Sequence, residues 1–244
     1  MVSGESTQFK GKTMRSLMKK AAGMGLALLA TSLTACATSY SAKPMTAKVV
    51  DADTGEPLEG VNVVAHWMME DPVAARGQGD LELMEAVTDR NGEFRFPGWG
   101  PKAIPSDTYP GTRLTNQDPA IIFFKSGYRS FAVINDSHSS MLRDPSDMGP
   151  AIRDSQWDGK VIKLEKYKGD LKKYGSFLIG LPGADLRDCK WKRIPKMMVA
   201  LNNEAERLRK QNIFNNLPTL GEIEDSSVGE NCGSVQEFFR GYLK

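Results

Sequence analysis

The stretch AKVVDADTGEPLEGVNVVAH, residues 47–66, decides the fold because it contains two short β-rich segments around a turn. The outer segments, AKVVDA at 47–52 and GVNVVAH at 60–66, are rich in valine, which favours extended chain. Between them, TGEPLEG carries the Gly and Pro residues that mark turns. We therefore expect two short strands joined by a turn.

A second pair of strand signals follows. LMEAVTD at 83–89 and GEFRFP at 92–97 meet at the sequence DRNG, in which Asn-Gly supplies the positive φ that a hairpin turn needs. Phe94 and Phe96 alternate with charged residues, so they share one face of the second arm. The pattern predicts a hairpin with that face in the core.

Three later segments complete the β-rich part. AIIFFK at 120–125 is continuously apolar, as expected of a central strand that is covered on both faces. YRSFAVI at 128–134 and KVIKLEK at 160–166 are further strand signals. Seven short strands separated by turn residues predict a mainly β protein with a seven-stranded, immunoglobulin-like β-sandwich.

The pattern becomes helical from residue 169 onward. In 194–212 the apolar residues recur at helical spacing on one stripe, with charged residues elsewhere. The residues of this stripe are Met197, Leu201, Ala205 and Leu208. A short final helix is expected at 234–243. We therefore predict a C-terminal α-helical extension, 169–244, whose apolar stripe packs on the sandwich or on neighbouring segments of the extension. The alternative is that the stripe enters the groove of a partner.

Two of the three cysteines belong to this extension. Cys189 and Cys232 form an even pair, which in an oxidising compartment predicts a disulfide. Closing a loop of about 44 residues would stabilise the fold by roughly 3–4 kcal/mol in the chain-entropy model. The alternative is two buried free thiols.

The N-terminus has the pattern of a secretory leader. Arg15, Lys19 and Lys20 precede the short apolar run 21–35, which ends in small residues. The run is shorter than the roughly 20 residues that a membrane-spanning helix needs. We expect a signal peptide at 1–35, with Met14 as an alternative start.

Leu33-Thr34-Ala35-Cys36 resembles the bacterial lipobox. This resemblance implies that the leader is cleaved before Cys36 and that its thiol carries a diacylglyceryl group. Several acyl chains would anchor the protein stably, and residues 36–45 would form a lipidated tether. Ala37, rather than Asp, favours the outer membrane, with the protein facing the periplasm. The alternative is a chance cysteine after an ordinary cleavage site.

The charge of the chain argues against nucleic-acid binding. The leader carries a net charge of +4, so its removal changes the formal charge from +2 to −2. A near-neutral chain lacks the positive field that nucleic-acid binders use. We expect a membrane as partner, together with an envelope protein or a glycan, and no nucleic acid.

Three motifs together resemble a known family. They are DADTGEPLEGVNV at 51–63, TDRNGEFRF at 88–96 and KSGY at 125–128. They are similar to the carboxypeptidase regulatory-like, or transthyretin-like, domain. The resemblance covers 47–166 and implies a seven-stranded sandwich at 46–168. It carries over no catalytic residue, because in metallocarboxypeptidases this module is an appendage.

The three long connections are 67–82, 98–118 and 135–159. If consecutive strands alternate in direction, all three fall at one end of the sandwich. Loops of this length are often functional. The candidate ligand residues in these loops are Trp99, Tyr109, His138 and Trp157. The alternative is that these aromatic residues cap the core. The tether should leave from this same end, with the helical extension emerging at the opposite end.

Enzyme motifs are missing from the sequence. It has no His-Glu-x-x-His, Gly-x-Ser-x-Gly or Gly-x-x-x-x-Gly-Lys pattern and only two histidines. Asp51-x-Asp53 begins like a calcium loop, but Glu56 and Asn62 break the pattern, which indicates a turn. We therefore predict no catalytic residue, no metal and no cofactor.

These observations favour an envelope lipoprotein that acts as a non-enzymatic binding or assembly module and presents its long loops to a protein or glycan. One alternative is a transthyretin-related hydrolase. Its family ends in Tyr-Arg-Gly-Ser, to which FRGY at 239–242 is superficially similar. The other alternative is a structural subunit that docks through the C-terminal helix.

Overall fold

The structure is a computed structural model that describes residues 39–74, 76–115, 117–136, 151–184, 186–226 and 231–243. Cys36 and His138 lie outside the described residues, as does the leader. Residues 38–244 form one compact unit. Among the described residues, no helix has both the length and the apolarity needed to span a bilayer.

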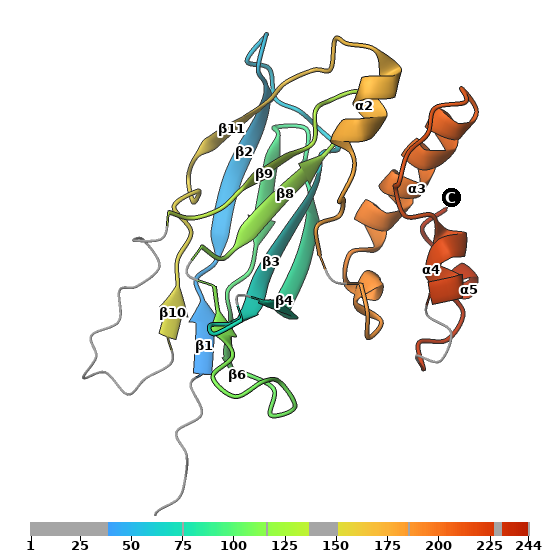
Figure 1. Cartoon of the computed structure of the whole chain (residues 1–244). Helices are drawn as coiled ribbons and strands as arrows, with labels where there is room; N and C mark the ends of the chain where they lie inside the picture. The colour runs from blue at the N-terminus through green and yellow to red at the C-terminus, as the bar shows by residue number, and fades with distance from the viewer. Residues whose placement is uncertain are drawn as a thin grey trace, which may run out of the picture. The chain divides into compact units, whose positions relative to one another are not determined.

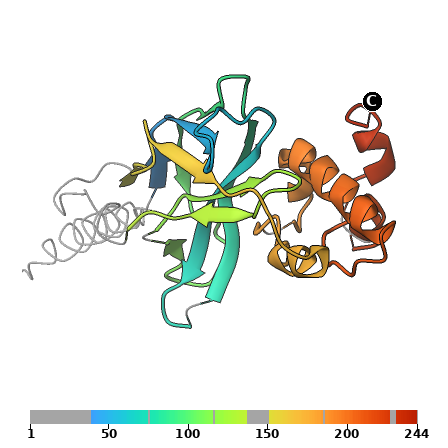
Figure 2. The same ribbon diagram turned by 90° about the horizontal axis from the view of Figure 1, so that it is seen from above.

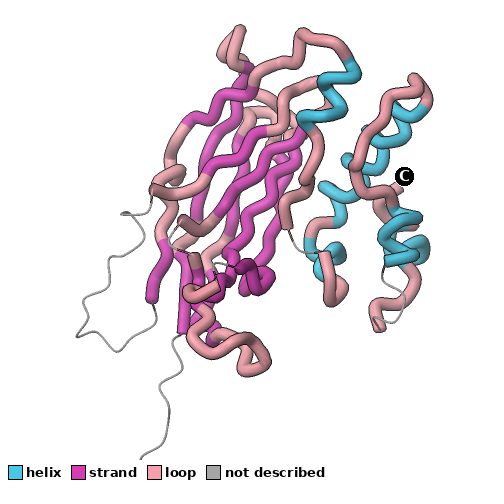
Figure 3. The backbone as a smooth tube through the Cα atoms, viewed as in Figure 1, coloured by secondary structure: helices cyan, strands magenta, loops and turns pink. Residues whose placement is uncertain are grey.

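The described chain is mainly β, followed by a few C-terminal helices (Figures 1 and 3). The strands are β1 (Ser39–Ala42), β2 (Met45–Asp51), β3 (Asn62–Asp71), β4 (Arg76–Val87), β5 (Glu93–Phe96), β6 (Trp99–Ala103), β7 (Arg113–Leu114), β8 (Ala120–Phe124), β9 (Phe131–Val133), β10 (Ala151–Arg153) and β11 (Val161–Leu164). The helices are α2 (Leu171–Phe177), the 3-10 helix η1 (Lys190–Arg193), α3 (Pro195–Arg209), α4 (Leu220–Ser226) and α5 (Val235–Phe239).

Two sheets pack face to face around the main core. One has the order β11-β2-β5, and the other has the order β4-β3-β8-β9 with β7 also paired to β3. The rings of Phe94 on β5 and Phe123 on β8 meet edge to face at 5.7 Å between the sheets. Phe96 is buried in the same core. The predicted core face of 92–97 is therefore confirmed.

A second core covers the outer face of the larger sheet. Val64, Leu83 and Phe124 point out of the sandwich and are buried by the helical extension. The four residues of the predicted α3 stripe are fully buried in this cluster. The predictions that the stripe packs on the sandwich and that β8 is covered on both faces are confirmed. Figure 2 shows the helices on one side of the strands.

The expected hairpin at 83–97 is wrong, although its turn is correct. Gly92 has a φ of +73°, and a Cβ there would overlap the carbonyl oxygen of Val49. However, β4 pairs with β3, whereas β5 pairs with β2 in the other sheet. The Thr88 hydroxyl, just after β4, donates to Leu58 O and accepts from Val61 N–H, so it ties the end of β4 to the chain that leads into β3. The turn therefore passes from one sheet to the other.

The expected tether is also partly wrong, because residues 39–42 form β1. This strand lies between β10, to which it is parallel, and β6, to which it is antiparallel. Tyr40 and Ala42 are buried, whereas Ser39 and Ser41 are half-buried. This alternation of polar and apolar residues is the physical reason that the segment pairs as a strand instead of staying free.

The expected loop at 67–82 is mostly strand as well. β3 continues to Asp71 and β4 begins at Arg76, so only a tight turn separates them. Together with β1, β6, β7 and β10, these extensions lengthen the sheets beyond the seven predicted segments. Most of the β1–β6–β10 sheet comes from segments that the sequence indicated as loops.

The helical extension does not stay at the opposite end of the sandwich. It leaves β11 beside the turn at 126–127, where the Gly127 amide donates to the Tyr174 hydroxyl of α2. It then runs back along the larger sheet, and η1 reaches β4. There Glu82 binds both Lys102 of β6 and Arg193 of η1. The apolar outer face of the sheet needs cover along its length, which explains this course.

Candidate functional site

The long connections meet at one end of the β-sandwich, which we call the connection end. Arg153, on the β9–β11 connection, lies 3.1 Å from the carboxylate of Asp118, on the β5–β8 connection. The Asn135 amide donates to the carbonyl groups of Asp118 and Asp154. β7 extends the same end by pairing with β3. The described parts of the connections 67–82, 98–118 and 135–159 therefore meet at one end, as expected.

The predicted ligand aromatics do not form one surface. Trp99 packs edge to face on Trp67 at 5.3 Å and contacts the main core. Trp157 also packs on that core, and its indole N–H donates to Ile134 O at 2.9 Å. Tyr109 is 63% exposed. Of the three described residues, two therefore cap the core and only Tyr109 is available to a partner.

Sequence reasoning missed a buried ion pair at the connection end. Asp118 is 1% exposed, and its burial raises the pKa of this carboxyl to about 7, although the charge of Arg153 opposes the shift. The Arg153 guanidinium also lies 5.3 Å from the Tyr40 ring. No local pattern could have indicated this pair, because its members are far apart in the sequence.

The hollow beside this pair is small. It is lined by Trp67, Pro119 and Arg153 together with residues of β1, β2 and the chain after β10, and it measures about 10 Å³. That volume holds about one water molecule. It does not hold a sugar or an amino-acid side chain, so a ligand at the connection end would have to bind to the exposed surface.

The opposite end of the sandwich, which we call the turn end, carries a buried carboxylate network. Glu204 of α3 is 2% exposed and accepts hydrogen bonds from the Ser126 hydroxyl and the Arg207 guanidinium. Burial raises the pKa of Glu204, but these hydrogen bonds outweigh that effect and hold it below its ordinary value. The network fixes α3 to the β8–β9 turn.

Two motifs that resembled one family meet at this same end. The Tyr128 hydroxyl donates to Asp51 at 2.9 Å, and the pKa of Asp51 is held low by that bond and by the amides of Asp53 and Thr54. Burial and the neighbouring carboxylate raise the pKa of Tyr128 to about 12. Asp51 therefore serves a turn, as the broken calcium pattern indicated.

Two larger hollows flank α2. One measures about 260 Å³ and is lined by Lys172, Gly175, Ser176, Ile179, Asn212, Phe214 and Asn215. The other measures about 280 Å³ and is lined by Ser126, Gly127, Tyr167, Gly169, Leu171, Tyr174 and Arg207. We call the first the α2 groove. Phe214 is 81% exposed and Ile179 is 57% exposed at this groove. No sequence motif indicated these residues.

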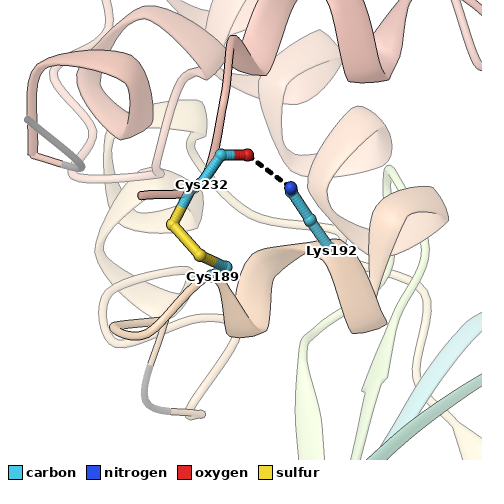
Figure 4. Close-up of a disulfide and its surroundings, with 3 residues drawn as sticks. All are labelled: Cys189, Lys192 and Cys232. Carbon is cyan, nitrogen blue, oxygen red and sulfur yellow. Dashed lines mark hydrogen bonds between the residues drawn. A yellow bond between two sulfur atoms is a disulfide. The ribbon is translucent and has the colours of Figure 1, made fainter. Parts of the chain in front are cut away.

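The disulfide braces the extension. Cys189 and Cys232 are bonded, with a Cα–Cα distance of 5.4 Å, which confirms the predicted pair. The Lys192 ammonium donates to the carbonyl oxygen of Cys232 next to the bond (Figure 4). Phe239, from the segment that superficially matched a hydrolase terminus, is buried and stacks on Trp191. That segment therefore serves the second core.

Two observations on the titratable groups of the described residues bear on metal binding and catalysis. The described residues contain no group of three or more His, Cys, Asp or Glu side chains placed to hold a metal ion. His66 and Asp80 lie 3.0 Å apart and are both buried within the β3–β4 ladder. A buried pair can be purely structural, so it does not by itself indicate an active site.

No protein-family model matches the chain, and no curated protein matches it. Among solved structures, it is similar to a 3-chlorocatechol 1,2-dioxygenase from Rhodococcus opacus 1CP, with 17% identity over 55% of this chain and 67% of that chain and a TM-score of 0.29. A 9R-lipoxygenase from Cyanothece PCC8801 matches with 13% identity over 85% of this chain and 31% of the lipoxygenase, with a TM-score of 0.25. Likenesses this distant carry no argument.

Proposed function

We propose that this protein is an outer-membrane lipoprotein, anchored through Cys36, that serves as a non-enzymatic assembly module. In this proposal a transthyretin-like sandwich of seven main strands, joined by shorter ones, is the scaffold. The helical extension supplies the surface that binds an envelope protein in the periplasm. Cys36 keeps its assignment from the lipobox at 33–36.

The exposure of Phe214 carries this proposal. Phe214 is 81% exposed and lines a groove of about 260 Å³ together with the exposed Ile179, so the two side chains form a shared apolar surface of the kind that marks interaction sites. Aromatic residues of this kind often dominate binding interfaces. The apolar stripe of α3 is already buried, so it cannot be the docking face.

The lining of the α2 groove suggests the chemistry of the partner. Phe214 and Ile179 provide apolar contact, Lys172 provides a positive charge, and Asn212 and Asn215 provide amide groups. A protein segment that presents an apolar side chain next to a carboxylate fits this combination. Such a segment would bind beside α2, against the exposed side chains of Phe214 and Ile179.

The test is site-specific photocrosslinking in cells, followed by binding measurements with purified proteins. A benzoylphenylalanine in place of Phe214 should crosslink one envelope protein, whereas the same probe in place of Phe131 should not. Phe131 is also exposed, but it lies on β9, outside the α2 groove. With the purified partner, Phe214→Ser should weaken binding by more than about tenfold.

The matched control is Tyr109→Ser, which removes the exposed aromatic residue of the connection end. We expect this variant to bind the partner normally. Binding that survives Phe214→Ser but fails with Tyr109→Ser would instead support presentation of the long loops to a partner, and the assignment to the α2 groove would be wrong.

A further inference from the structure

The connection of the anchor to the fold is very short. Only Ala37 and Thr38 separate Cys36 from Ser39, the first residue of β1. An extended chain spans at most about 3.6 Å per residue, so the Cα atoms of Cys36 and Ser39 lie within about 11 Å of each other. A membrane anchor at Cys36 would therefore hold the start of β1 close to the bilayer surface.

β1 is folded, so it does not lengthen the connection between Cys36 and the sandwich. Its pairing with both β6 and β10 buries Tyr40, and the Lys43 amide donates to Arg153 O at 3.0 Å just beyond its end. The fixed strand begins at the connection end, because Ser39 pairs with Ala103, the last residue of β6. The loop that follows β6 carries Tyr109.

Two exposed apolar tips occur at this end. Val73 is 92% exposed in the β3–β4 turn, and Tyr109 is 63% exposed in the loop between β6 and β7. These segments touch, because a Cβ on Gly111 would lie 3.9 Å from Pro72 Cγ, which is ordinary van der Waals contact. Val73 and Tyr109 therefore lie on neighbouring segments at this end. Figure 1 places β1 and β6 at this same end.

The chemistry of these tips fits the boundary between lipid and water. Tyrosine is enriched at that boundary, where its ring contacts acyl chains and its hydroxyl stays hydrated. Arg113 of β7, close to these tips, is paired with Glu70 at 3.2 Å and so is not a free positive charge for anionic lipids. Attraction to the bilayer would therefore come from apolar contact and from the short anchor rather than from anionic lipids.

We propose that the connection end rests on the bilayer that receives the acyl chains of Cys36, with Val73 and Tyr109 inserted among the lipid headgroups. This inference rests on the proposed lipid anchor. It places the turn end on the far side of the module, about 33 Å away along the ten residues of β3. The α2 groove, beside the turn end, then faces the periplasm and can receive a partner.

Spin labelling of the full-length lipoprotein tests this placement. Cys189 and Cys232 are bonded and Cys36 would be acylated, so an introduced cysteine is the only free thiol. The probes are Val73→Cys and Tyr109→Cys. The matched controls are Ile179→Cys and Phe214→Cys, which label equally exposed apolar positions at the α2 groove. Each protein is reconstituted in phosphatidylcholine vesicles and labelled with a nitroxide.

The readout is the accessibility of the nitroxide to oxygen, which enters bilayers, relative to a water-soluble nickel chelate. We expect this ratio to be several-fold higher at 73 and 109 than at 179 and 214. Intact mass determines separately whether Cys36 is acylated. Acylated protein with low ratios at 73 and 109 would overturn the inference and leave the anchor in place. An unmodified Cys36 would overturn the anchor and the inference with it.

Discussion

Asp118 is the residue whose environment differs most from what its type suggests. Its carboxyl is 1% exposed, and its pKa is raised from 3.8 to about 7 because burial disfavours the charged form. Between those two pH values the folded state keeps a proton that the unfolded state has released. The contribution of Asp118 to stability is therefore greatest below pH 4 and is lost as the pH rises to 7.

The variant Asp118→Asn should reveal this contribution. A shift of about three pKa units corresponds to roughly 4 kcal/mol. We expect the free energy of unfolding of the wild type, relative to Asp118→Asn, to fall by up to that amount between pH 4 and pH 7. Urea denaturation at several pH values measures it. The exposed Asp107→Asn serves as control, and a difference that rises with pH would contradict the assignment.

Residue-level prediction from the sequence succeeded where the signal was local. Asn91-Gly92 indicated a turn with positive φ, and Gly92 has it. For Trp99 and Trp157 the sequence left two readings open, ligand binding and capping of the core, and their contacts with the main core support capping. Asp118 and Arg153 could not be paired from the sequence, since only the fold brings two distant connections together.

At the scale of elements, Glu82 joins the sandwich to the helical extension. Its side chain is buried, and it binds Lys102 of β6 and Arg193 of η1, which are both partly exposed. Replacing Glu82 with Gln should lower the free energy of unfolding by about 1–3 kcal/mol, because charged hydrogen bonds to a buried carboxylate are lost. Thermal or urea unfolding would show the loss.

The matched change is Glu165→Gln, which breaks a solvent-exposed pair with Arg129. Exposed pairs contribute about 0–1 kcal/mol, so this variant should be nearly as stable as the wild type. Equal effects of Glu82→Gln and Glu165→Gln would mean that Glu82 does not brace the extension.

The disulfide closes the part of the chain that contains Asn212, Phe214 and Asn215 of the α2 groove. Its cysteines are 43 residues apart, so the double variant Cys189→Ala/Cys232→Ala should lose about 3–4 kcal/mol of unfolding free energy. Denaturation under oxidising conditions measures this loss. Reduced wild-type protein should match the double variant. Unchanged stability in the double variant would show that the loop is already ordered without the bond.

Each of the seven predicted segments overlaps a strand of the structure, because each has a local apolar pattern. β1 escaped prediction because it is only four residues long and its partners, β6 and β10, lie far along the chain. The hairpin at 83–97 was wrong for a related reason. A local turn signal indicates where the chain reverses, but it does not indicate which sheet the next strand joins.

At the scale of the whole molecule, the sandwich depends on the extension. Val64, Leu83 and Phe124 are buried only because helices cover the outer face of the larger sheet. A fragment ending at residue 168 should therefore aggregate or unfold, since it would expose this apolar face to water. Sedimentation and circular dichroism of the fragment test this.

A repaired fragment keeps that prediction falsifiable. Val64→Thr, Leu83→Lys and Phe124→Thr in the fragment should restore solubility, because they make the uncovered face polar while the main core stays intact. Solubility of the unmodified fragment would show that the sandwich is an independent domain.

The course of the extension could have been inferred from one segment. AIIFF at 120–124 is buried at every position, so its outer face requires cover, and residues 169–244 provide it. The pattern indicated the strand but not the position of the helices. The extension emerges at the opposite end as expected, beside Gly127, but it then returns along the larger sheet, so that Arg193 binds Glu82. The physical reason is the need to bury both faces of β8.

The position of β1 between β6 and β10 also determines how the molecule responds to traction. A pull on the N-terminal side of Ser39 acts along the strand axis, so the hydrogen bonds on both sides of β1 lie across the direction of force. They must rupture together in shear rather than unzip one after another. The strand nearest the lipidation site is thus a mechanical clamp.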